Sequence, residues 1–372
     1  MSPSMEPIVT GGAILAYRLV DIAYEIDLAK AEAAWARTVR SAVSRGRLTA
    51  TPANAMSFGV PPVQLALNPV LVALPSGAVE ASVVARLYDF GVVSLVLRVP
   101  VANETWSGFA ARMHAVEAWV AADVPWPALL AQVRHGIGDA IVRPTTNCVE
   151  EDYLVGLVHT LDEPMTADVL QQRVDLVTLL SGEQRPLSES ARRDVLQHRY
   201  SYYTDDLVAL TWNRAFILEP RGDTDVVDVL EVANAQLLEM RYYDELLDDE
   251  LPRMYDMVQE MHRRRVWPGV GRYAALARKL YTLVAEVTEL TEKADNALQV
   301  IDDVYLARVY AAALDLFRVR VLAAAVDRKL SIIRDTYTSL YDEASHSRAT
   351  VLELIVVLLI LSEVIMAVVR IH

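Results

Sequence analysis

Two patterns of hydrophobic and polar residues divide the chain near residue 222. In the first part, several stretches alternate hydrophobic and polar residues, as strands with one buried face do. The predicted strands cover 13–28, 63–74, 79–101, 152–160 and 205–218, and the predicted helices cover 29–44, 105–122 (capped by Asn103 or Thr105), 126–135 and 166–181. Their order is irregular and contains no repeated strand–helix–strand unit. We therefore expect an α+β domain with a largely antiparallel sheet over residues 1–222.

After Asp223 the pattern becomes helical. Hydrophobic residues recur in alternating steps of three and four over several heptads, which predicts long helices packed along a common seam. One such run is Leu276, Leu280, Leu283, Val287 and Leu290. We expect a coiled-coil-like helix bundle over 223–348 and association of identical copies through its seam.

The sequence also indicates where these helices begin and end. The run 268–271, Pro-Gly-Val-Gly, ends one helix, because proline and glycine disfavour helix interiors. Asp302 or Asp303 is placed to cap a later helix. Pro252 stands inside the first long helix and is expected to kink or split it.

The last residues are strongly hydrophobic. Residues 351–371 form a helix of about 31 Å, long enough for the hydrocarbon core of a bilayer. Their fifteen Val, Leu and Ile residues favour insertion by about −5 to −9 kcal/mol, and a buried carboxylate opposes it by about 3 kcal/mol. With the cost of Glu353 and Glu363 included, the net free energy of insertion stays favourable by a small amount. We therefore expect a C-terminal membrane-anchor helix over 349–372. The alternative is the central helix of an oligomer.

Composition and charge narrow the function classes that the chain can belong to. Hydrophobic residues make up 53% of the 372 residues, and Lys+Arg 35 against Asp+Glu 49 gives a net charge of −14. Phosphate backbones repel such a chain, so direct nucleic-acid binding is not expected. Cys148 is the one cysteine, so the chain cannot form an internal disulfide. We expect this side chain to be packed and unreactive rather than a nucleophile. The first ten residues do not resemble a signal peptide.

The acidic residues are concentrated in one segment. Residues 223–262 contain twelve acidic residues and only Arg241 and Arg253 as basic ones. A solvated helix face is the simplest interpretation. A docking surface for a basic protein partner is a second, and a divalent-cation site at 248–250 (Asp-Asp-Glu) is a third, weakened because neighbouring side chains on a helix diverge.

Catalytic motifs are scarce. The seven histidines are scattered, and no nucleotide loop, nucleophile elbow or zinc-binding helix motif occurs. His159 with Asp162 and Glu163 is most simply a strand end and turn. Asp205 and Asp206 form a possible carboxylate pair for acid–base chemistry, but successive strand residues point to opposite faces. We expect no catalytic, cofactor-binding or metal-binding residue.

Some segments nevertheless resemble a known family. They are 87–93 (LYDFGVV), 202–206 (YYTDD), 328–335 (RKLSIIRD) and 352–364 (LELIVVLLILSEV). On these the chain resembles the YagE family, which includes proteins named for a requirement in meiotic nuclear division. The resemblance implies a membrane-associated protein without established enzymatic activity, and the composition favours a bacterial member at the cytoplasmic face of the inner membrane.

Together these observations predict a three-part chain: an α+β domain over 1–222, a helix bundle over 223–348 and an anchor over 349–372. The expected function is that of a membrane-tethered scaffold or adaptor that contacts membrane lipid and is homo-oligomeric. One alternative is an enzyme acting through Asp205, Asp206 or His159. Another is a CorA-like ion transporter, which would need two spans and a Gly-Met-Asn signature that this sequence lacks.

Overall fold

The computed structural model describes most of the chain. The described residues are 6–38, 43–45, 56–122, 125–145, 149–183, 185–263, 270–300 and 303–371. They form two compact units. Unit 1 contains Met1–Tyr242 and Glu292–Arg320, and unit 2 contains Tyr243–Thr291 and Val321–His372. Cys148, which we expected to be packed and inert, lies outside the described residues.

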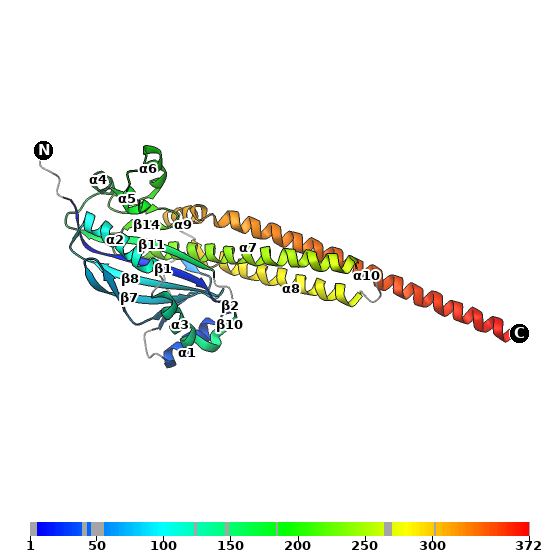
Figure 1. Cartoon of the computed structure of the whole chain (residues 1–372). Helices are drawn as coiled ribbons and strands as arrows, with labels where there is room; N and C mark the ends of the chain where they lie inside the picture. Colours follow the sequence, from blue (N-terminus) through cyan, green and yellow to red (C-terminus); the bar gives the residue numbers. More distant parts are fainter. Residues whose placement is uncertain are drawn as a thin grey trace. The chain divides into compact units, whose positions relative to one another are not determined.

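Unit 1 is built on a large mixed sheet (Figure 1). Its described strands are β1 (Ile8–Asp21), β3 (Val43–Arg45), β5 (Val63–Ala66), β6 (Val70–Leu74), β7 (Gly77–Leu87), β8 (Val92–Val101), β9 (Glu104–Thr105), β11 (Glu150–Leu161), β12 (His198–Tyr200), β13 (Leu207–Leu210) and β14 (Arg214–Leu218). The order is β12-β13-β14-β11-β1-β8-β7-β5-β3, with β6 beside β7 and β9 beside β1. Every described pair is antiparallel except β11–β14. The predicted α+β class is confirmed.

The remaining described elements complete the list. The helices are α1 (Leu28–Thr38), α2 (Trp106–Ala121), α3 (Trp126–Ile137), η1 (Gly138–Ala140), α4 (Ala167–Arg173), α5 (Leu176–Ser181), α6 (Glu189–Val195), α7 (Asp225–Arg263), α8 (Val270–Asp295), α9 (Val304–Leu316) and α10 (Val319–Ile371). Two small pairs, β2 (Ala23–Ile26) with β10 (Ile141–Pro144) and β4 (Met56–Phe58) with β15 (Leu298–Val300), lie outside the main sheet.

Strand β1 is buried on both faces. Its even-numbered residues Ile14, Ala16 and Val20 join a core cluster with side chains of α1, α2 and α3. Its odd-numbered residues face the first part of α7, because the carboxylates of that helix act electrostatically on Tyr17. Two helical layers therefore cover the sheet. Helix α7 is buried all round over residues 227–240, because the end of α8 and α9 pack on its other side: Gln236 donates to the backbone oxygen of Ala294 and accepts from the hydroxyl of Tyr310.

Local signals set several element ends. Thr105 caps α2 by accepting a hydrogen bond from the N–H of Gly108, and Asp303 caps α9 through the N–H of Leu306, as predicted. The helix predicted over 166–181 is two helices, because Asp175 caps a second one, α5. The strand predicted over 205–218 is the β13–β14 hairpin. Helix α6 and strand β12 were not predicted.

The β7–β8 turn packs tightly against the end of β1. Gly91 has a φ of 94°, and its carbonyl accepts a hydrogen bond from Ile22 N–H at 3.1 Å. A Cβ at Gly91 would lie 1.8 Å from the backbone oxygen of Ala23. Only glycine fits both the conformation and the space.

We therefore expect Gly91→Ala to lower the free energy of unfolding by about 3 kcal/mol or more, because backbone strain and a backbone clash add. Urea denaturation of the full chain measures it. Gly77→Ala is the matched control, since Gly77 also has a positive φ of 123° but has open space around it. Equal losses in the two variants would contradict the close approach.

Unit 2 consists of the second part of α7, most of α8 and most of α10. Its buried side chains recur at helical spacing, as in Leu247 and Met254 of α7, Leu280 of α8, and Leu330 and Ile333 of α10. The Nζ of Lys329 lies 2.6 Å from Asp244 Oδ1 and 2.7 Å from Asp248 Oδ1, which joins α10 to α7. Helix α7 is continuous across Pro252, which does not split it.

The membrane prediction requires a correction. Over the part of the chain that the structure describes, no helix combines the length and the apolar character that a membrane crossing requires. The membrane anchor expected over 349–372 is therefore wrong, as is the location at the bacterial inner membrane. The physical reason is that Glu353 and Glu363 interrupt the apolar run, and the expected gain from insertion was only slightly larger than their cost.

Candidate functional site

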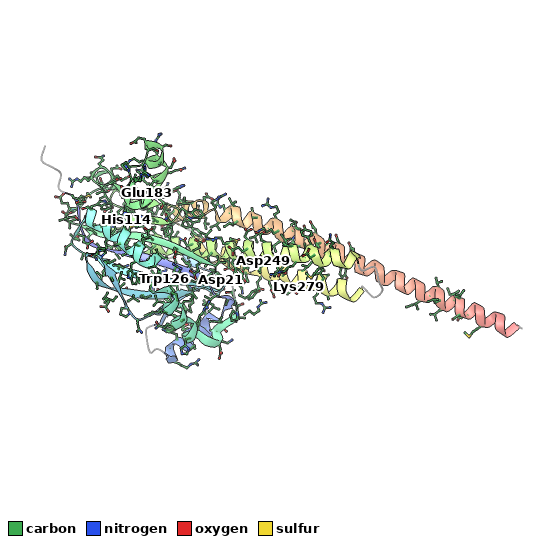
Figure 2. All side chains as sticks on the ribbon, in the orientation of Figure 1. Asp21, His114, Trp126, Glu183, Asp249 and Lys279 are labelled. Atoms are coloured by element: carbon green, nitrogen blue, oxygen red, sulfur yellow. The ribbon has the colours of Figure 1, made fainter. Side chains whose placement is uncertain are left out.

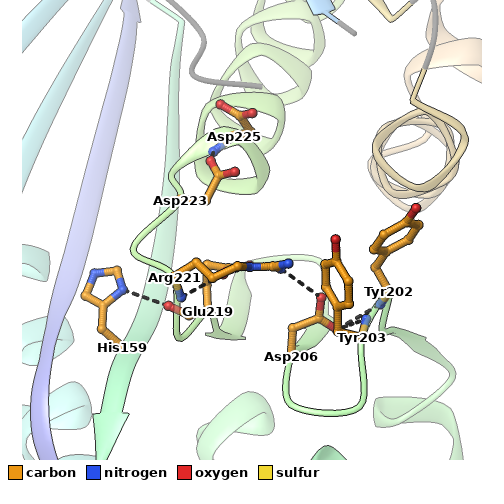
Figure 3. A network of polar contacts seen from close by, with 8 residues as sticks. All are labelled: His159, Tyr202, Tyr203, Asp206, Glu219, Arg221, Asp223 and Asp225. Atoms are coloured by element: carbon orange, nitrogen blue, oxygen red, sulfur yellow. Dashed lines mark hydrogen bonds and ion pairs between the residues drawn. The ribbon is translucent and has the colours of Figure 1, made fainter. Parts of the chain in front are cut away.

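A short loop between β12 and β13 places two tyrosines on the surface of unit 1. Asp206 is buried, and its Oδ1 accepts hydrogen bonds from the N–H groups of Tyr202 at 2.8 Å and Tyr203 at 3.1 Å (Figure 3). These two bonds close the loop upon itself. The side chains of Tyr202 and Tyr203 are left 62% and 50% exposed.

Arg221 stacks on this loop from the turn after β14. Its Nε donates to Glu219 Oε1 at 3.0 Å and its Nη2 to Glu219 Oε2 at 3.2 Å, a bidentate pair. Nη2 also lies 3.5 Å from Asp206 Oδ2. The guanidinium carbon sits 3.9 Å from the centre of the Tyr203 ring, within cation–π range. The arginine is therefore fixed by two carboxylates and one ring while half its side chain faces solvent.

Contacts within this group and burial shift the pKa values of Arg221 and Asp206. The hydrogen bonds to Glu219 raise the pKa of Arg221 above its ordinary value. Burial raises the pKa of Asp206, and the two backbone N–H donors oppose that rise. Asp206 thus acts as an acceptor that organises the loop and helps to hold the guanidinium.

The aromatic contacts extend to α9 and β12. The rings of Tyr202 and Tyr203 meet edge to face with their centroids 4.7 Å apart, and the ring centroid of Tyr202 lies 5.5 Å from that of Tyr305 on α9. The Arg308 guanidinium of α9 lies 5.5 Å from the Tyr200 ring on β12. We call this set the Tyr–Arg surface; its members are Tyr200, Tyr202, Tyr203, Arg221, Tyr305 and Arg308.

The structure separates the residues that the sequence grouped as a possible acid–base site. Asp205 is exposed, whereas the adjacent Asp206 is buried. His159 Nδ1 is 3.0 Å from the backbone oxygen of Glu219. Asp162 accepts a hydrogen bond from Ile8 N–H, and Glu163 pairs with Arg173. His159 is thus near the Tyr–Arg surface through Glu219, but Asp162 and Glu163 have other partners.

Within the described ranges, no group of three or more His, Cys, Asp or Glu side chains is arranged to hold a metal ion. At 248–250, the acidic side chains have basic partners instead: Asp248 pairs with Lys329, and Glu250 pairs with Arg253 and Lys279.

The acidic segment 223–262 is divided between the interior and the surface. Asp225, Asp228, Glu231 and Glu239 are all buried in the first part of α7. The acids that remain exposed lie further along the helix: Glu245, Asp248, Asp249 and Asp256. Among the described side chains, this second group is what α7 offers to the expected basic partner.

Two of these buried acids meet one arginine. Arg86 Nη1 on β7 lies 2.6 Å from Asp228 Oδ1 and 2.7 Å from Glu231 Oε2. Tyr88 donates to Glu231 Oε1 at 3.3 Å. Burial raises the pKa of both carboxyls, and Arg86 opposes that rise. Sequence analysis did not find this cluster, although acids spaced along an otherwise buried helix were a usable signal.

Asp21, at the end of β1, is a second buried acid of interest (Figure 2). Its Oδ1 accepts a hydrogen bond from Ala23 N–H at 3.3 Å, and its Oδ2 has no hydrogen-bond partner among the described residues. Burial raises the pKa of Asp21 to about 7, while the Ala23 N–H and the charge of Arg134 oppose the rise. This carboxyl group therefore titrates near neutral pH.

Comparison with known proteins identifies the family. A family model described as the N-terminal domain of uncharacterized protein MJ0711 matches residues 11–224, more than half of the chain. The chain belongs to this family. Uncharacterized protein MJ0711 of Methanocaldococcus jannaschii is 26% identical over 199 residues, which cover 53% of this chain and 59% of that protein. The chain thus spans less than two thirds of that relative's length. No solved structure matches.

Membership of the MJ0711 N-terminal domain family corrects the expected family. The resemblance to the YagE and meiotic-nuclear-division proteins is wrong, and the expected bacterial source has no support, since the relative found is archaeal. The resemblance rested mainly on 328–335 and 352–364, which lie outside the matched region. Runs of Leu, Ile and Val recur wherever a helix packs along a hydrophobic seam, so they distinguish families poorly.

The matched MJ0711 N-terminal domain contains the loop and turn that build the Tyr–Arg surface. Tyr202, Tyr203, Asp206, Glu219 and Arg221 all lie within residues 11–224. The two members on α9 lie beyond it.

Proposed function

We propose that the chain is a non-catalytic binding protein, an adaptor that engages a partner protein through the Tyr–Arg surface of unit 1. The observation that carries this is the pair of exposed tyrosines held in place by Asp206 and stacked with Arg221. Tyrosine and arginine are the side chains most enriched, with tryptophan, among residues that dominate binding energy at protein interfaces.

The surface is also ordered in advance. Immobilising a flexible side chain on binding costs about 0.5–1.5 kcal/mol. Arg221 is already fixed by its bidentate pair with Glu219, and the backbone of the two tyrosines by Asp206. A partner would therefore meet a rigid aromatic surface and lose less entropy on binding.

The charge balance indicates what kind of partner fits. Glu219 and Asp206 offset the charge of Arg221. Contacts to ring faces and tyrosine hydroxyls, rather than net charge, then supply the affinity. We expect a partner with an apolar or aromatic contact residue and a weak dependence of affinity on salt.

An enzyme acting through Asp205, Asp206 or His159 is supported less well. Asp206 Oδ1 already accepts two backbone N–H groups, and Oδ2 faces Arg221. His159 contacts a backbone carbonyl, and Asp205 lies apart on the surface. These arrangements stabilise the loop, whereas acid–base chemistry needs groups that converge on a substrate.

A photo-crosslinking residue tests the adaptor function directly. Placed at Tyr203 in the full chain and irradiated in cells of the source organism, it is expected to yield a defined crosslinked protein. The matched control is the same residue at Tyr255, an equally exposed tyrosine (56%) of unit 2. Tyr202→Ala is then expected to weaken binding of the purified partner at least about 10-fold, as loss of a central aromatic contact does. Identical products from both positions, or none from position 203, would refute the proposal.

A further inference from the structure

The last part of α10 exposes large hydrophobic side chains (Figure 1, red end). Their exposed fractions run from 48% to 64%, far above those of the core. The described members are Ile355, Val356, Val357, Leu358, Leu359, Ile360, Leu361 and Met366. A stretch with seven such residues in succession is apolar on every side, and helices of this kind are normally buried by other protein.

The same helix has an established seam further upstream. In unit 2, Val326, Leu330, Ile333 and Leu340 of α10 are buried, and with the half-buried Tyr337 they follow alternating steps of four and three residues. The sequence continues that register without a break to the end of the helix. The continuing seam positions are 344, 347, 351, 354, 358, 361, 365 and 368, occupied by Ala, Ser, Val, Leu, Leu, Leu, Ile and Val.

The partners of this seam within the chain end earlier than the seam does. Tyr281 of α8 stacks against Tyr337 of α10 at 5.8 Å. The two helices run in opposite directions, and α8 begins at Val270. At equal rise per residue, α8 can accompany α10 only to about residue 348. The seam from there onward needs another occupant.

Charged residues mark which side of the helix faces that occupant. The stretch contains Glu353, Glu363 and Arg370, and each follows a seam position by two residues. All three therefore stand on the side away from the seam, where a coiled coil keeps its polar residues. Four of the six seam positions from 351 onward, Val351, Leu354, Leu361 and Ile365, follow the core pattern of a parallel two-helix coiled coil, whereas Leu358 and Val368 depart from it.

We propose that the chain self-associates through the end of α10, where the seam from about residue 349 onward packs against the same seam of a second copy. This extends the hydrophobic seam of unit 2 into an interface between copies. It is independent of the adaptor function. If both hold, the assembly presents two or more Tyr–Arg surfaces at once, which strengthens binding to a multivalent partner.

Paired charge substitutions in the full chain test this proposal. Leu358→Glu with Leu361→Glu places two charges in the seam, whereas Val356→Glu with Ile360→Glu places them on the outer side. Sedimentation velocity is expected to give at least twice the monomer mass of 41.3 kDa for the unaltered chain. The seam pair is expected to raise the dissociation constant at least ~100-fold, because charges would be buried in an apolar interface, and the outer pair less than ~5-fold.

Three outcomes would overturn the proposal. The first is a monomeric unaltered chain at about 50 μM, a concentration at which a specific interface would be populated. The second is an equal effect of the seam pair and the outer pair. The third is a chain that is monomeric in buffer but pellets with phosphatidylcholine–phosphatidylglycerol vesicles. The thermal transition of unit 1 checks that both variants stay folded, since the substituted side chains are exposed.

Discussion

Replacing Arg86 by methionine is expected to lower the free energy of unfolding by about 3–5 kcal/mol at pH 7. The Asp228 carboxylate, 8% exposed, and the Glu231 carboxylate, 1% exposed, would lose the cation that both contact. Methionine fills much of the volume, so the loss reports charge rather than a cavity. With Arg86 gone, burial keeps the pKa of both carboxyls raised, and the largest opposing effect, the charge of Arg86, is lost. The loss should therefore shrink as the pH falls towards 5 and both groups take up protons.

Urea denaturation of the full chain at pH 7 and pH 5 provides the measurement. Arg320→Met is the control, because Arg320 pairs with Asp315 at 3.0 Å on the surface with both side chains more than half exposed. Such pairs contribute about 0–1 kcal/mol. Adding Asp228→Asn and Glu231→Gln to Arg86→Met should restore part of the stability. A loss no larger than in the control would show that the cluster is not the buried ion group described above.

Replacing Asp21 by asparagine is expected to stabilise the protein above pH 7 and to change little at pH 5. The folded-state pKa of about 7 lies above the ordinary value of 3.8, so the folded protein holds this proton more tightly than the unfolded chain. Stability from the protonated group is complete below about pH 4 and is lost as the pH rises through 7. The difference between the two pKa values corresponds to at most about 4 kcal/mol of folding free energy. Asparagine mimics the protonated acid and removes this pH dependence.

Thermal unfolding from pH 5 to pH 8.5 measures that effect. The ionisable groups facing Asp21 include Arg134 and Tyr242, and burial together with Asp21 and Glu239 raises the pKa of Tyr242 to about 12. Asp27→Asn is the control, since Asp27 accepts the Lys30 N–H at the start of α1 and its pKa is lowered. Its contribution has the opposite sign and is lost as the pH falls. A wild-type and an Asp21→Asn curve that stay parallel from pH 5 to 8.5 would contradict the raised pKa.

The sequence allowed much of unit 1 to be predicted, because its signals were local. The strands around β1, β7, β8 and β11 followed from hydrophobic runs, and the start of α2 followed from Thr105 as an N-cap. Much less of the candidate site could be predicted from the sequence. Asp206 was noticed, but its contact with Arg221 joins two turns, and the Tyr202–Tyr305 stacking joins residues far apart in sequence.

The acidic segment shows the same difficulty. A run of acids on a helix is normally solvated, and only the opposing sheet reveals otherwise. Arg86 lies 142 residues before Asp228 along the chain, so no local pattern connects them. Pairing of this kind is decided by the fold, and the fold is set mainly by the hydrophobic residues around it.

One carboxyl group, that of Asp206, supports the whole of the tyrosine loop. Its Oδ1 accepts the N–H groups of both tyrosines, and its Oδ2 lies 3.5 Å from the guanidinium that stacks on one of them. A change at this position would free the backbone of Tyr202 and Tyr203 together, whereas Arg221 would keep its bidentate pair with Glu219. We therefore expect the proposed binding to depend on residue 206 even though that residue is buried.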